Sequence, residues 1–118
     1  MRRVTFQPEF QVDILREEKI QTMRLSPLKW RIGEVVAAVS PKDGKPGFLV
    51  PASEAFCYLR LVDERSVFWV DVTEEDADKC GVTKDWYRER YGARLTDFTR
   101  VFIYEFQRVG HYKFEVVR

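Results

Sequence analysis

The sequence has little of what several common classes of protein require. Its two cysteines, Cys57 and Cys80, and its one histidine, His111, provide neither a disulfide framework nor the spacing of a zinc site. It has no run of about 18 apolar residues, the length that a membrane-spanning helix needs, and no apolar stretch of a signal peptide near residue 1. We therefore predict a cytoplasmic protein that needs no metal or other cofactor and does not associate with a membrane.

A strong excess of charge of one sign is also missing. The chain has 20 Lys and Arg against 19 Asp and Glu, so its net charge is +1. This excludes the domain-wide positive charge typical of many nucleic-acid-binding proteins, although a local basic patch remains possible. Charged residues make up 33% and hydrophobic residues 45%, which is typical of a globular protein. A length of 118 residues fits a single domain, residues 1–118, with one core.

Apolar patterning predicts the order of the secondary-structure elements. Helices are expected at residues 8–18, after the Thr73 cap and after the Thr83 cap, with glycines ending the last two. Strands are expected at residues 3–6, 20–24, 34–39, 56–62, 67–72, 100–109 and 112–117. The polar link at 63–66 predicts a hairpin between two of them, and short links in general favour antiparallel pairing. The expected fold class is α+β, a small mixed β-barrel with short helices at its rim.

The segment EEKIQTMR, residues 17–24, carries the most specific pattern of polar side chains. It places Lys19, Thr22 and Arg24 within six residues. Because side chains alternate along a strand, Thr22 and Arg24 are expected to share a face. An ammonium, a hydroxyl and a guanidinium held together suit a polar, anionic ligand. The alternative is a solvated junction at which the two cations are ordinary surface charges.

Two aromatic features lie outside this segment. Trp30 would either stack on a base or cover the rim of the barrel. The segment WYRERYGAR, residues 86–94, interleaves aromatic residues with three arginines. It fits a nucleic-acid-binding face, and it fits an amphipathic helix equally well. The apolar pattern around Trp86 predicts a place in the core.

From Thr5 to Val35, and on through the segments 56–62, 70–77 and 101–109, the sequence resembles the ASCH domain, a family with a PUA-like fold. The resemblance covers most of the chain, and the loop at 45–52 and the tail after Val109 fall outside it. The family signature is Gly, one residue, Lys, two residues, Glu or Thr, one residue and Arg, followed by a Gly-Asp pair. Here Glu17 stands in place of the Gly and Glu34 in place of the Asp. The residues that carry the resemblance are Thr5, Phe6, Phe10, Gln11, Asp13, Ile14, Leu15, Lys19, Thr22, Arg24, Ile32, Gly33, Glu34 and Val35.

PUA-like barrels occur in RNA-modifying proteins, so the resemblance implies a cleft that binds RNA or a modified nucleoside. Lys19, Thr22 and Arg24 would line this cleft, and Trp30 would stack on the ligand. A third possibility is a protein-interaction domain that has the ASCH fold but lacks the binding site.

Within that family, the form with Thr is similar to the small N4-acetylcytidine amidohydrolases. The resemblance implies catalytic roles for Lys19 and Thr22, with Thr22 as nucleophile and a neutral Lys19 as its base. Those enzymes also use a glutamate from a later short helix, and Cys80 takes its place here. We predict that Cys80 is a small packing residue. An amidohydrolase is therefore the alternative function.

Overall fold

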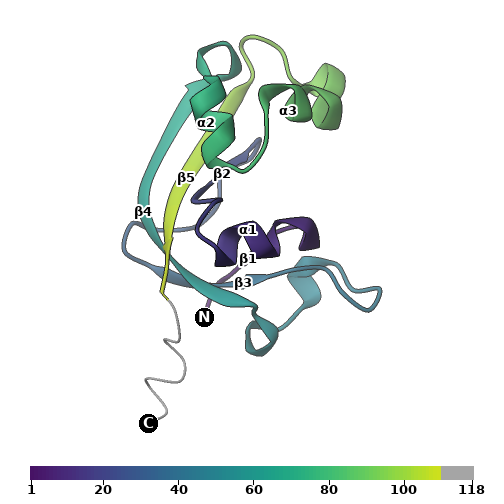
Figure 1. Ribbon diagram of the computed structural model, residues 1–118, viewed down its shortest axis with the longest axis vertical. Coiled ribbons are helices and arrows are strands. Elements are labelled where there is room, and N and C mark those ends of the chain that lie inside the picture. Colours follow the sequence, from purple (N-terminus) through teal and green to yellow (C-terminus); the bar gives the residue numbers. More distant parts are fainter. Residues whose placement is uncertain (110–118) are drawn as a thin grey trace.

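A computed structural model describes residues 1–109 of the chain, and the predicted strand at 112–117 lies outside them, as does His111. One sheet of five strands organises the molecule (Figure 1). β3 and β1 are parallel, and all other neighbours are antiparallel. In spatial order the strands are β1 (Arg3–Thr5), β3 (Val35–Val39), β4 (Cys57–Phe68), β5 (Arg100–Arg108) and β2 (Gln21–Arg24).

The predicted α+β class, a mixed sheet with short helices, is confirmed, but the sheet of the described residues is not closed, so the term barrel describes it only loosely. β1 and β2 form its two edges within residues 1–109. In a closed barrel the edge strands β1 and β2 would pair with each other. Here a side chain joins them instead, because the Arg24 guanidinium of β2 donates to the backbone oxygen of Thr5 in β1 at 2.7 Å. The two edges therefore meet at a polar side chain, and this is where the candidate site lies.

β4 corrects one prediction outright. It runs unbroken through residues 63–66, where the sequence predicted a hairpin turn, and ends at Phe68. The 3-10 turn η4 (Trp69–Asp71) follows where the predicted strand 67–72 would continue. Residues 63–66 pair with residues 102–105 of β5, after an irregularity between Leu61 and Asp63. The second half of β4, residues 62–68, is mostly exposed, which explains why many of its residues are polar. The hairpin prediction was wrong because the partner that satisfies this backbone lies far away in the sequence.

The two later helices, α2 (Glu74–Lys79) and α3 (Lys84–Tyr91), begin where their caps predict. The Thr73 hydroxyl accepts the amide of Asp76, and the Thr83 hydroxyl accepts the amide of Trp86. Each threonine thus satisfies an N–H group that has no partner inside the helix.

The first helix is shorter than predicted. A 3-10 turn, η1 (Pro8–Phe10), leads into α1 (Gln11–Leu15), which ends well before residue 18. The chain turns at Glu17, whose φ of 61° is left-handed and cannot continue a right-handed helix. This turn directs the following residues into β2.

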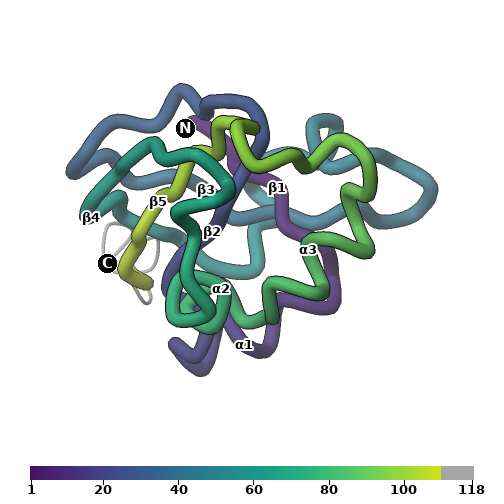
Figure 2. The backbone as a smooth tube through the Cα atoms, turned by 90° about the horizontal axis from the view of Figure 1, so that it is seen from above, coloured from purple at the N-terminus to yellow at the C-terminus, as the bar shows by residue number. Residues whose placement is uncertain are grey.

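Two hydrophobic clusters pack against the sheet. One joins β1, β3, β4 and Trp30, and the other joins α2 and α3 to β2 and β5. Figure 2 shows α1 beside α2 and α3, and the ring of Phe10 contacts Trp86 edge-on with centroids 5.7 Å apart. Over residues 1–109, no helix has the length and apolar character needed to cross a bilayer.

Candidate functional site

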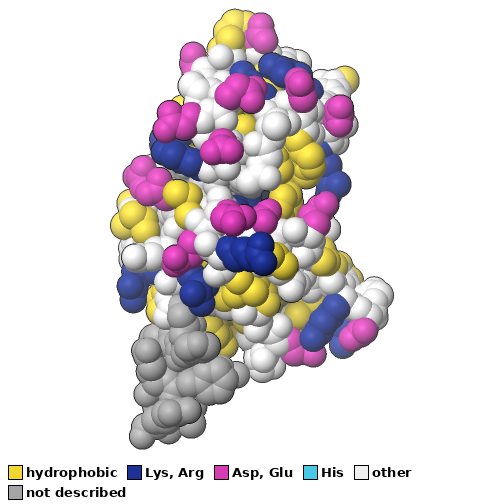
Figure 3. Space-filling view, in the orientation of Figure 1, with side chains coloured by type: hydrophobic (Ala, Val, Ile, Leu, Met, Phe, Trp, Pro, Cys, Tyr) yellow, Lys and Arg dark blue, Asp and Glu magenta, His cyan; other side chains and the backbone are white. Residues whose placement is uncertain are grey.

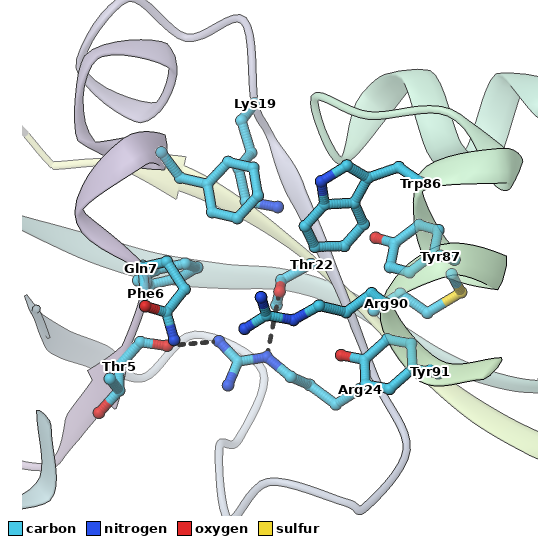
Figure 4. Close-up of a pocket in the computed structure, with 12 residues that line it drawn as sticks. Thr5, Phe6, Gln7, Lys19, Thr22, Arg24, Trp86, Tyr87, Arg90 and Tyr91 are labelled. Carbon is cyan, nitrogen blue, oxygen red and sulfur yellow. Dashed lines mark hydrogen bonds between the residues drawn. The ribbon is translucent and has the colours of Figure 1, made fainter. Parts of the chain in front are cut away.

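A pocket of about 180 Å³ lies where β1, the first helical segment, β2 and α3 meet (Figure 4). A cavity of about 150 Å³ can hold a benzene ring, so this pocket has room for roughly one six-membered ring. The structure brings the predicted Lys19, Thr22 and Arg24 together in it. Its lining residues are Thr5, Phe6, Gln7, Phe10, Lys19, Thr22, Met23, Arg24, Trp86, Tyr87, Arg90 and Tyr91.

Lys19 is a buried cation with two fixed hydrogen bonds. Only 3% of its surface is exposed. Its ammonium donates to the backbone oxygens of Gln21 at 2.9 Å and Cys80 at 2.8 Å, and it lies 4.8 Å from the centroid of the Phe10 ring. Burial lowers its pKa from 10.5 to about 8, and the nearby Arg24 charge adds to this effect. Two of its three donor positions are therefore occupied by the protein, and one is left.

Arg24, which is half-buried, is the second cation of the pocket. Its Nε donates to the Thr22 hydroxyl at 3.1 Å, and its guanidinium lies over the Phe6 ring, 5.3 Å from the centroid. Burial lowers the pKa of Arg24, but a guanidinium stays charged at any working pH. Because Thr22 and Arg24 are two residues apart on β2, they share a face as predicted.

α3 supplies the wall opposite β2. The sequence leaves this segment open between a nucleic-acid-binding face and an amphipathic helix, and no residue of it is assigned to the cleft. Trp86 is half-buried and lines the pocket instead of lying in the core. Tyr87 and Tyr91 stack with centroids 6.2 Å apart, and burial raises the pKa of the Tyr87 hydroxyl. Arg90 completes the wall. These four residues have the i, i+1, i+4, i+5 spacing of one helical face, a signal that the sequence did contain.

The charge of the pocket is of one sign. Lys19, Arg24 and Arg90 line it, and among the described residues no carboxylate does. The nearby acids of α2 are used elsewhere: Asp76 accepts the Thr73 amide and pairs with Arg65. Figure 3 shows acidic and basic side chains intermixed over one whole face of the molecule, so the positive character there is local rather than a broad basic surface.

The structure places the two remaining candidates outside the pocket. Trp30 is 3% exposed, stacks against Tyr104 and Phe106 in the first cluster, and donates its Nε1 to the Glu34 carbonyl. It has no free face for a base. The Cys80 side chain is buried in the second cluster, in agreement with a packing residue. Only the Cys80 backbone oxygen reaches the site, as an acceptor for Lys19.

Comparisons with solved structures identify the fold. An ASCH domain from Lactobacillus crispatus aligns over 92% of this chain and 80% of its own, with 14% identity and a TM-score of 0.65. An ASCH protein from Zymomonas mobilis aligns over 98% and 77%, with 10% identity and a TM-score of 0.68. The chain has the ASCH-domain fold. No protein-family model and no curated protein matches the sequence.

The ASCH fold gives a physical reason for one departure in the motif. Glu17 stands where the ASCH signature has Gly, and its φ of 61° lies in the left-handed region that glycine enters most easily. The backbone at Glu17 therefore makes a turn that glycine would adopt more easily, although a Cβ is present. This turn carries Lys19 from the end of α1 to the start of β2.

Proposed function

We propose that this ASCH-fold protein binds a single base in the pocket, either of RNA or of a free, modified nucleoside. The observation that carries this proposal is the combination of one buried and one half-buried cation, both hydrogen-bonded, with an aromatic wall and no carboxylate among the described lining residues. ASCH domains are linked to RNA-related functions, which supports the same class of ligand.

The donors favour a base that presents acceptors. Ammonium and guanidinium groups donate but cannot accept, so Lys19 and Arg24 suit a ring carbonyl or an unprotonated ring nitrogen. Trp86 and Tyr91 offer rings on which a base can stack, a contact worth about 1–3 kcal/mol per base. The volume fits one ring better than two, so we expect pyrimidine nucleosides to bind more tightly than purine nucleosides.

Tryptophan fluorescence tests this proposal. Trp86 lines the pocket, whereas Trp30 and Trp69 are buried elsewhere, so a stacked base should quench Trp86 alone. We expect saturable quenching by cytidine, uridine or N4-acetylcytidine, and its loss in Trp86→Phe. Thr22→Val is the matched pocket variant, because it removes one hydroxyl at nearly constant volume and should weaken binding. Absence of saturable quenching and of binding by calorimetry, with folded protein, would contradict the proposal.

One observation favours the alternative function, an amidohydrolase of N4-acetylcytidine-type nucleosides. With a pKa of about 8, Lys19 is partly neutral near physiological pH, and a neutral amine that donates two N–H groups to carbonyls presents its lone pair in the remaining direction. It would take the proton of the Thr22 hydroxyl as that oxygen attacks the acetyl carbonyl, with Arg24 stabilising the oxyanion. The proton would then pass to the leaving N4 amine. Water would release acetate from Thr22.

Release of cytidine from N4-acetylcytidine tests the alternative. The rate should rise with pH through about 8, because the base is the neutral form of Lys19. It should vanish in Lys19→Met, whose fold is checked by circular dichroism. Binding of the nucleoside without turnover at any pH would reject catalysis and leave the binding function in place.

A further inference from the structure

Two further arginines lie on the α3 side of the pocket and add positive charge there. Arg90 lines the pocket from α3, and Arg94 follows in the next turn, η5 (Gly92–Arg94). Each is exposed and lies over an aromatic ring, with the guanidinium carbon 5.8 Å from the centroid of Trp86 or Tyr91. Neither forms an ion pair with any described residue. Both rings line the pocket, and so does Arg90, whereas Arg94 is linked to the pocket through the Tyr91 ring.

The third arginine of this segment provides an internal contrast. Arg88 also lies 5.8 Å from a ring centroid, that of Trp69, but it pairs with Asp85 at 2.6 Å and does not line the pocket. Asp85 thus neutralises Arg88, which does not line the pocket. Arg90 and Arg94 are left charged and unpaired within the described residues.

A guanidinium that lies over a ring without an ionic partner keeps N–H groups available. Its planar N–H edge matches two oxygens of a phosphate, and the cation–π contact with the ring keeps the group near the aromatic wall before a ligand arrives. The pocket itself has room for about one ring, so the sugar and phosphate of a bound nucleotide must lie outside it. Arg90 and Arg94 occupy such a position.

We propose that Arg90 and Arg94 bind a phosphate attached to the nucleoside whose base fills the pocket. The ligand class is then a nucleotide, either a free monophosphate or a residue within an RNA strand. This inference rests on the proposed function, because the base must enter the pocket for its phosphate to reach these arginines. The recognition is divided: β2 and the aromatic wall select the base, and the two arginines select the phosphate.

Affinity measurements on a matched ligand series test the proposal. The probes are cytidine, its 5′- and 3′-monophosphates, and tricytidylate RNA, each titrated from low to moderate salt. We expect at least one phosphorylated ligand to bind about tenfold more tightly than cytidine. In Arg90→Gln/Arg94→Gln this gain should disappear, and in the single variant Arg94→Gln it should shrink. Arg88→Gln, on α3 and at the same distance from a ring centroid, should keep this gain.

The salt dependence separates the two sources of the phosphate. For a single strand, the slope of log affinity against log salt changes by about 0.7 for each phosphate contact. If the ligand is RNA, tricytidylate gives the steeper slope and Arg94→Gln lowers it by about that amount. If it is a free nucleotide, the monophosphate binds as tightly as the trinucleotide.

Other outcomes contradict the proposal in distinguishable ways. Equal affinity for cytidine and its phosphates would overturn the phosphate site and leave the base pocket intact. An equal loss of the phosphate gain in Arg88→Gln would show that general positive charge is responsible, which also overturns it. Failure of every probe, cytidine included, would reject the proposed function together with the phosphate site.

Discussion

The two walls of the pocket carry the same kind of charge in opposite environments. On the β2 side, Lys19 is buried and Arg24 is half-buried, and both donate to backbone oxygens. On the α3 side, Arg90 and Arg94 are exposed, and each lies over an aromatic ring, that of Trp86 or Tyr91. Burial strains the first pair electrostatically, since desolvation lowers the pKa of both groups. The second pair keeps its hydration until a ligand arrives.

The difference indicates a division of labour. Buried donors with fixed partners cannot move far, so they can discriminate between ligands that differ by one acceptor. Exposed guanidinium groups contribute mainly to affinity and to the rate of encounter, and salt screens them. A substitution on β2 should therefore affect both stability and recognition. A substitution on the α3 side should affect binding alone.

The largest expected effect concerns Lys19 and pH. Its pKa is about 8 in the folded protein against an ordinary value of 10.5. Between these values the unfolded chain binds a proton that the folded chain does not, so the free energy of unfolding rises with pH over this window. The rise amounts to about 3 kcal/mol and is complete near the ordinary value. Urea titrations at several pH values measure it.

Lys19→Met is the control for that window. Tyr87 titrates in the opposite direction at higher pH, because its raised pKa costs stability once the unfolded chain ionises, but this contribution is common to both proteins. The difference between wild type and variant should therefore isolate Lys19. Parallel curves for the two proteins would show that Lys19 is not desolvated.

The next effect contrasts the two arginine environments directly. Arg24→Met removes the hydrogen bonds to the Thr5 oxygen and the Thr22 hydroxyl, which join the two edges of the sheet. We expect a loss of about 2 kcal/mol in the free energy of unfolding. Arg90→Met should stay within about 0.5 kcal/mol of wild type, because its guanidinium is exposed and has no ionic partner among the described residues. Thermal and urea unfolding measure both variants. If Arg24→Met and Arg90→Met lowered the free energy of unfolding equally, the two walls would not differ in their contribution to stability.

The smallest effect concerns the turn that delivers Lys19 to β2. Glu17 holds a left-handed φ of 61°, so Glu17→Gly should raise the free energy of unfolding by about 0.5 kcal/mol, the relief of strain less the added freedom of the unfolded chain. Glu18 has no positive φ and provides the matched control, since Glu18→Gly should lower stability by a similar amount. Destabilisation by both changes would mean that the turn is unstrained.

Local patterns predicted much of this structure. The caps at Thr73 and Thr83 and the last described strand lie where the letters place them, because capping and strand alternation depend on neighbours only a few residues away. The predicted hairpin at 63–66 failed because those residues pair with β5. Trp30 and Trp86 show the same limit. Trp30 was expected to stack on a base or cover the rim and Trp86 to lie in the core, yet Trp30 is core and Trp86 lines the pocket.

The sequence by itself determined the chemistry of one wall. The alternation of β2 is enough to put Thr22 and Arg24 on one face, with Lys19 just before them. Only the tertiary structure decided that α3 faces this strand, that Arg90 rather than Arg88 turns to the pocket, and that the Cys80 carbonyl fixes Lys19. Those contacts join residues some sixty positions apart, as the Lys19–Cys80 bond does. They follow from packing two hydrophobic clusters on one sheet, which no local pattern encodes.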